Sequence, residues 1–300
     1  MASIIDDLKR SYQSGNMVTR LIFINVGVFV ALSLLRVFGF FYQSEVLSSF
    51  IPWIAGTSNW ETMLFRPWTI VSYMFVHEGL WHLFFNMIML WFSGRLFGDL
   101  LGDKRMVAVY IYGGIAGFLL YFFAYNLFPV FSGSNSIIIG ASASVIAILV
   151  AIATYSPNMV IRLVLIGNIQ LKWIAIFFVA LDVLFLDGGN SGGRLAHLGG
   201  ALLGFSYAKS LQGGKDWATG FNSFADSFVD LFKRKPKMRV ASSKRPSKKS
   251  KGPFSSEKKK SSGTAEQKKI DEILDKISQS GYDSLSKAEK EYLFNASNKK

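Results

Sequence analysis

Repeated apolar runs of membrane length constrain this chain more than any other feature. Half of its 300 residues are hydrophobic, including 27 Phe and 7 Trp. A soluble domain of this size alternates apolar and polar residues, whereas runs near 20 residues are typical of membrane helices. We expect six such helices, at 19–41, 81–98, 106–127, 137–155, 171–187 and 194–211. The second run extends upstream through residues 67–79, so its start is the least defined. The predicted fold class is an all-α polytopic membrane protein.

Lysine and arginine lie mainly on one side of these runs, and cytoplasmic loops are the ones that carry such an excess. The basic residues of this side are Lys9, Arg10, Arg20, Lys104, Arg105, Arg162 and Lys172. The opposite side carries Arg66, in the long loop 42–68, and Arg194. Both termini are therefore expected in the cytoplasm. The loop 42–68 is aromatic and poor in charge, and we expect it at the membrane interface, with an ordinary packed loop as the alternative.

The C-terminal tail holds most of the net charge of +13. Residues 1–208 carry 11 Lys and Arg against 9 Asp and Glu, and residues 209–300 carry 22 against 11. We divide the chain into a cytoplasmic N-terminal segment (1–18), a membrane domain (19–211), an amphipathic helix on the membrane surface (212–232), a basic disordered linker (233–264) and a small helical module (265–300). Beside a bilayer, the basic linker is expected to bind anionic lipid rather than nucleic acid.

The small C-terminal module shows helical spacing and a helix start signal. Ile270, Ile273 and Ile277 share one helix face, and Ser286 with Glu289 forms a capping-box pattern before the second helix. A module of this kind binds a partner or itself, and the sequence does not identify which.

The chain has no cysteine, which excludes disulfides, thiolate metal sites and a cysteine nucleophile. Its first 17 residues are polar and lack a short apolar core with a cleavage site, so no removable signal peptide is expected. These features favour a bacterial plasma membrane, with an organelle as the alternative.

A small set of polar residues lies inside the apolar runs, where such groups are costly and are candidate functional sites. Ser142 lies about five residues into the fourth run and His197 about three into the sixth, on the order of 5–8 Å below the outer edge. His82 lies near the start of the second run, and Asn86 follows it one turn later on the same face. Three helices that run in the same direction thus bring a hydroxyl, an imidazole and two further hydrogen-bonding groups to one layer.

This combination matches the needs of nucleophilic attack on a carbonyl. A serine hydroxyl becomes a nucleophile when a base such as neutral histidine takes its proton, and the resulting oxyanion needs fixed donors. His82, Asn86 and the backbone N–H of Ser142 are candidate donors. Gly140 and its alanine neighbours allow close approach of backbone and substrate.

Three motifs together resemble the rhomboid family of intramembrane serine proteases. They are "HEGLWHLFFN" in the second run, "GASA" in the fourth and "AHLGGALLG" in the sixth, with "RPWT" at residues 66–69 as a further similarity. The resemblance covers residues 15–211 and implies a six-helix rhomboid-like bundle with a cytoplasmic tail. It implies Ser142 as nucleophile, His197 as base, and a dyad without an acidic third member. The implied oxyanion site is His82, Asn86 and the Ser142 N–H; the implied structural and packing residues are Gly140, Gly200, Gly204, His77 and Arg66.

The sequence departs from the family pattern at three positions: Ala143 follows the serine in place of the common glycine, Ile146 replaces an aromatic residue, and Gly98 replaces a glutamate. Ser144 is interpreted as a packing residue. Asp182, in the fifth run, either pairs with a polar group of the bundle or marks the inner end of a bent span, and we assign it no catalytic role. A metal site is the weaker interpretation of the histidines, because His82 and His197 supply only two ligands.

The function that we predict is an intramembrane serine endopeptidase without a cofactor. It would cut transmembrane or membrane-tethered proteins near the outer face. One alternative is a catalytically weak or inactive relative that binds membrane proteins. The other is a transporter or channel, which predicts internal repeats that the sequence lacks.

Overall fold

A computed structural model of the chain describes residues 6, 12–13, 15–44, 49–163, 167–232 and 265–297. The chain forms two compact units, residues 1–236 and 237–300. The prediction of a predominantly helical chain is confirmed. The basic linker 233–264 and most of the N-terminal segment 1–18 lie outside the described residues.

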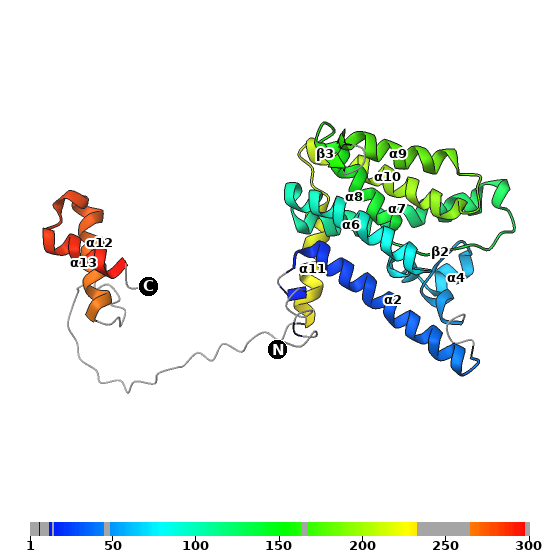
Figure 1. Ribbon diagram of the computed structural model, residues 1–300, viewed down its shortest axis with the longest axis horizontal. Helices are drawn as coiled ribbons and strands as arrows, with labels where there is room; N and C mark the ends of the chain where they lie inside the picture. Colours follow the sequence, from blue (N-terminus) through cyan, green and yellow to red (C-terminus); the bar gives the residue numbers. More distant parts are fainter. Residues whose placement is uncertain are drawn as a thin grey trace, which may run out of the picture. The chain divides into compact units, whose positions relative to one another are not determined.

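Six helices make up the body of the first unit (Figure 1). They are α2 (Met17–Phe41), α6 (Leu80–Leu101), α7 (Asp103–Leu127), α8 (Ser142–Tyr155), α9 (Leu171–Leu184) and α10 (Ser191–Gln212). Two of them, α2 and α7, are long and apolar enough by length and composition to cross a membrane, and α8 is a shorter apolar helix.

Helix α8 is the centre of this bundle, because α6, α7, α9 and α10 all contact it. Its residues from Ala143 to Ala153 are all buried. A helix that is apolar on every face is stable only when protein or lipid surrounds it. The outer helices show the reverse pattern: large apolar side chains such as Leu34 and Phe40 of α2 and Trp91 of α6 are exposed.

Small residues bring α10 against α8. A Cβ atom at Gly200 would collide with the carbonyl oxygen of Ala143, and one at Gly204 with that of Ala147. Gly117 of α7 approaches the same region, since its Cβ would lie 2.7 Å from that of Ala143. Helices of this kind pack at short distance because no side chain separates their backbones.

The connections contain short elements that the apolar pattern did not predict. Two-residue strands β1 (Gly56–Thr57) and β2 (Ile137–Ile138) pair antiparallel, and β3 (Val160–Leu163) pairs with β4 (Gly167–Gln170). The loop before α6 holds α4 (Trp60–Phe65) and α5 (Thr69–Ser72), with 3₁₀ turns at Ile51–Trp53 and Tyr73–Phe75; a further turn spans Pro129–Phe131. The upstream extension of the second run is therefore a separate segment, and extended backbone at Val76 ends it before α6 begins.

The long first loop is held together by its aromatic and basic side chains. The guanidinium carbon of Arg66 lies 3.9 Å from the ring centroid of Trp53, and Arg66 Nη1 donates to the Pro52 carbonyl at 3.0 Å. Trp68 Nε1 donates to the Trp53 carbonyl at 2.7 Å. Arg66 thus has its contacts within this loop.

After α10 the chain continues as α11 (Ala218–Phe232), in which Phe221 packs on Tyr112 of α7 while Phe224 is exposed.

The second unit contains α12 (Ala265–Ser280), a 3₁₀ turn at Tyr282–Ser284 and α13 (Lys287–Ser297). The capping box is present, because the Ser286 N–H donates to Glu289 Oε2 at 2.7 Å and the Glu289 N–H donates to Ser286 Oγ at 3.3 Å.

Candidate active site

Ser142 is the first residue of α8, whereas the sequence predicted that it lies about five residues into the helical run that begins at 137. The physical reason is the chain just before it, where β2 is extended and Gly140 adopts φ +123°, a conformation that L side chains rarely adopt. The Gly140 N–H donates to the Tyr73 carbonyl at 2.9 Å, which fixes this turn. A hydroxyl therefore stands at the N-terminus of a buried helix.

His197 reaches Ser142 from the neighbouring helix α10. Its Nε2 atom lies 2.7 Å from Ser142 Oγ, a hydrogen-bond distance. His197 is the seventh residue of α10, which begins at Ser191 rather than near 194, because Asn190 caps the helix by accepting from the Gly193 N–H. The serine and histidine that the sequence analysis selected are thus in direct contact.

Asp182 of α9 lies on the other side of the imidazole. Its Oδ1 atom is 2.9 Å from His197 Nδ1 and 3.7 Å from Arg194 Nη1. From the sequence, Asp182 had no assigned catalytic role, and the family resemblance implied a dyad without an acidic member; in the structure the Asp182 carboxylate lies within hydrogen-bond distance of His197. Asp182 lies two residues before the end of α9, and its contacts match the first of the two sequence interpretations, a pairing with a polar group of the bundle.

The two candidate oxyanion side chains come from α6. A Cβ atom at Gly140 would lie 2.8 Å from His82 Nε2, so this ring fits against the turn before Ser142 only because residue 140 is glycine. Asn86 lies one turn further on, and its Nδ2 donates to the His82 carbonyl at 2.8 Å. The Ser142 N–H belongs to the first turn of α8, where backbone donors have no partner within the helix.

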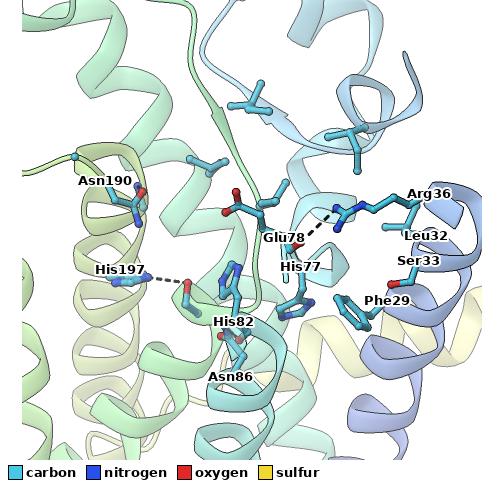
Figure 2. A pocket seen from close by; sticks show the side chains of 17 residues that line it. Phe29, Leu32, Ser33, Arg36, His77, Glu78, His82, Asn86, Asn190 and His197 are labelled. Atoms are coloured by element: carbon cyan, nitrogen blue, oxygen red, sulfur yellow. Dashed lines mark hydrogen bonds between the residues drawn. The ribbon is translucent and has the colours of Figure 1, made fainter. Parts of the chain in front are cut away.

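A cavity of about 770 Å³ opens beside the serine and histidine (Figure 2). Helices α2, α6, α8 and α10 all contribute to its wall, and Phe29, Arg36, His82, Asn86, Ser142 and His197 are among the lining residues. Arg36 of α2 donates to the carbonyl of Glu78, a second lining residue, at 3.4 Å. A second, mostly apolar cavity of about 290 Å³ lies between α6 and α9 and also touches Ser142 and His197.

Two other polar residues lie near the site without joining the serine–histidine contact. His77 is buried in the turn before α6, with its ring 5.2 Å from that of His82 and edge-on to it. Burial, and to a smaller extent His82, lowers the pKa of His77 to about 4, so its ring is neutral at pH 7. Ser144 is fully buried, and its Oγ lies 3.7 Å from Met74 Sδ.

The combination of fold and site defines a helical bundle with a hydrogen-bonded serine and histidine at the start of its central helix. Residues 64–212 match the family model of the rhomboid domain. The chain belongs to the rhomboid family, and it is therefore a membrane protein. Residues 256–299 match a second model, a family of unknown function designated DUF6576.

Curated relatives match part of the chain. The presenilin-associated rhomboid-like protein A, mitochondrial, of Danio rerio is 33% identical over 141 residues, which are 44% of this chain and 34% of that protein. The RHOMBOID-like protein 12, mitochondrial, of Arabidopsis thaliana is 27% identical over 197 residues, 62% of this chain and 55% of that protein. The rhomboid-related protein 1 of Caenorhabditis elegans is 30% identical over 154 residues, 47% and 39% of the two chains. The chain thus spans between about a third and just over half of these relatives.

Proposed function

We propose that this protein is an intramembrane serine endopeptidase. The observation that carries the proposal is the 2.7 Å contact between Ser142 Oγ and His197 Nε2 at the N-terminus of α8. In the proposed reaction, His197 takes the hydroxyl proton while Oγ attacks the carbonyl carbon of the scissile peptide bond. The proton then passes to the leaving amine, and water hydrolyses the acyl-enzyme by the same route.

The negative oxygen formed by this attack would be stabilised at the start of α8. The Ser142 N–H and the positive end of the helix dipole favour an anion there. His82 adds a ring nitrogen beside the same turn. The Asn86 amide nitrogen has two N–H donors, and one of them is bonded to the His82 carbonyl. We therefore assign the oxyanion role to the backbone N–H, to His82 and to the second N–H of Asn86.

We further propose that α2 and α6 to α10 span the membrane with both termini and the C-terminal tail in the cytoplasm. The exposed apolar side chains of the outer helices and the distribution of lysine and arginine support this arrangement. Helix α8 has 14 residues and rises about 21 Å, less than the roughly 30 Å hydrocarbon core. A short central helix of this kind supports a site below the outer surface, where a substrate helix must unwind to be cut.

The expected partners are transmembrane protein substrates, the bilayer and, at the basic tail, anionic lipid. The exposed Phe224 of α11 supports contact between this helix and the membrane surface. A bacterial plasma membrane remains our proposal for the compartment. The names of the Danio rerio and Arabidopsis thaliana relatives place those proteins in mitochondria and lend this choice no support.

A rhomboid-like protein that binds membrane proteins without cutting them is the second candidate. The relatives from Danio rerio and Arabidopsis thaliana favour it, because their names state likeness to rhomboids, and in the first case association with presenilin, but no cleavage. In that case the 770 Å³ cavity would hold a bound segment without reaction.

Reconstitution in lipid with a model transmembrane substrate separates the two candidates. We expect cleavage by the native chain, loss of cleavage in Ser142→Ala and His197→Ala, and retention in Ser144→Ala, which removes a buried hydroxyl that does not face His197. A fluorophosphonate should label the native chain and not Ser142→Ala. If several substrates stay intact and Ser142 is not labelled, the protease proposal is wrong and the binding candidate replaces it.

A further inference from the structure

The carboxylate of Asp182 completes a line of three side chains from three helices. One imidazole nitrogen of His197 faces Asp182 Oδ1 at 2.9 Å, and the other faces Ser142 Oγ at 2.7 Å. The two ring nitrogens of a neutral histidine have opposite roles, one a donor and the other an acceptor. A carboxylate that accepts the Nδ1 proton therefore leaves Nε2 free to accept the serine proton.

The surroundings of Asp182 keep its carboxylate in this position. The side chain is 9% exposed and lies in the last turn of α9, a helix that is otherwise apolar there. Arg194 Nη1, 3.7 Å away, supplies the positive charge that a buried carboxylate needs, and the same atom donates to the Leu181 carbonyl at 3.4 Å. The arginine is thus tied to the backbone beside Asp182, and His197 remains the shorter contact of the carboxylate.

From this geometry we propose that Asp182 is a positioning residue for His197, so that the chain uses a Ser–His–Asp arrangement. The inference rests on the proposed protease function. During attack the proton moves from Ser142 Oγ to His197 Nε2 and then to the leaving amine, while the Nδ1 proton stays on the ring and its hydrogen bond to Asp182 persists. Asp182 itself takes no proton; it selects the ring tautomer and stabilises the imidazolium that forms.

The competing explanation is that Asp182 only ties α9 to α10. A purely structural tie affects melting temperature and substrate binding, whereas a positioning role affects kcat and the histidine tautomer. The variant Asp182→Asn separates the two, because it keeps the size of the side chain and removes its charge. Asp187→Asn is the matched control: it makes the same chemical change at an exposed residue just after α9.

In the full chain reconstituted with a cleavable substrate, we expect Asp182→Asn to lower kcat by about 10²–10⁴-fold. KM and melting temperature should stay close to those of the native chain, and Asp187→Asn should cleave at the native rate. The positioning role is overturned if Asp182→Asn keeps the native kcat, or if Asp187→Asn lowers kcat by as much as Asp182→Asn does. Either result leaves the protease proposal intact.

A spectroscopic test does not depend on cleavage. The chain has three histidines, so nitrogen-15 labelling of histidine gives a simple spectrum, and His197→Ala identifies the signals of His197. At pH 9, where imidazole is ordinarily neutral, we expect the native His197 to carry its proton on Nδ1. In Asp182→Asn the amide can donate to Nδ1, and the proton should move to Nε2. A native ring protonated on Nε2 overturns the inference without the Asp182→Asn variant, even if no substrate is ever cut.

Discussion

At the scale of single residues, Gly140 shows how one backbone position builds the site. Its φ of +123° turns the chain from β2 into α8, and its missing side chain leaves the space that His82 occupies. Glycine adopts this conformation without the steric cost that other residues incur. The position of Ser142 as the first helical residue and the position of His82 beside it therefore depend on the same glycine.

We predict that Gly140→Ala slows fluorophosphonate labelling of Ser142. A strained backbone conformation costs about 1–3 kcal/mol, and the new methyl group would displace His82, so a loss of about 10- to 100-fold is expected. The control is Gly27→Ala in α2, where a Cβ atom meets nothing within 4 Å. Equal labelling rates in the two variants would show that the turn tolerates a side chain.

The serine, the two histidines and the asparagine were selected from the sequence because polar groups in apolar runs are conspicuous. Asp182 was equally conspicuous, yet its partner was not predicted. It precedes His197 by 15 residues and lies on a different helix, so no helical spacing relates the two. Only the packing of α9 against α10 brings them together. A carboxylate in an apolar helix whose neighbouring helix carries a histidine is the signal that sequence reasoning could have used.

At the scale of elements, the contact of α10 with α8 determines whether His197 reaches Ser142. Gly200 and Gly204 face the carbonyl oxygens of Ala143 and Ala147, so the two helices touch through their backbones. The resemblance to the rhomboid family implied Gly200 and Gly204 as packing residues. A side chain at either glycine must push α10 away from the helix that bears the serine.

We predict that Gly200→Ala destabilises the bundle and slows labelling of Ser142. Overpacking of this kind typically costs about 1–3 kcal/mol, which should lower the melting temperature in detergent. Gly220→Ala in α11 is the control, because its Cβ would meet nothing within 4 Å. If Gly200→Ala has the native melting temperature and the native labelling rate, α10 can move away from α8 without loss of stability or reactivity.

Element boundaries were predictable where apolar patterns end at polar loops. They were not predictable where pairing between strands far apart in the sequence sets the boundary. The runs at 19–41 and 106–127 lie within α2 and α7, which begin slightly earlier, at Met17 and Asp103, and end at the same residues as the runs. The run at 137–155 was wrong at its beginning, because residues 137–138 pair with 56–57 about 80 residues earlier. A two-residue strand has no periodicity to detect, and its partner lies in a loop.

At the scale of the whole molecule, the chain separates into a rhomboid unit and a C-terminal unit. The last part of the first unit is tied to the bundle by Asp216, which accepts from Arg105 Nε at 2.7 Å and from the Tyr207 hydroxyl at 3.1 Å. The contacts among Asp182, His197 and Ser142 described above all lie within the first unit.

A chain that ends after Pro236 should therefore label with fluorophosphonate within about twofold of the full chain, as expected for independent parts. A chain that ends after Gln212 loses Asp216 as well, and its melting temperature should fall below that of the longer fragment. If ending the chain after Pro236 already abolishes labelling, the C-terminal unit takes part in forming the site.

The proposed nucleophile and its base are 55 residues apart, and the base lies on the last helix of the bundle. During synthesis, Ser142 leaves the ribosome before His197. Under the proposed function, a nascent chain at that stage would carry the serine without a base to activate it, and a truncated product that lacks α10 would be inert. The order of helices along the chain would then delay reactivity until the bundle is complete, with no separate inhibitory segment needed for that purpose.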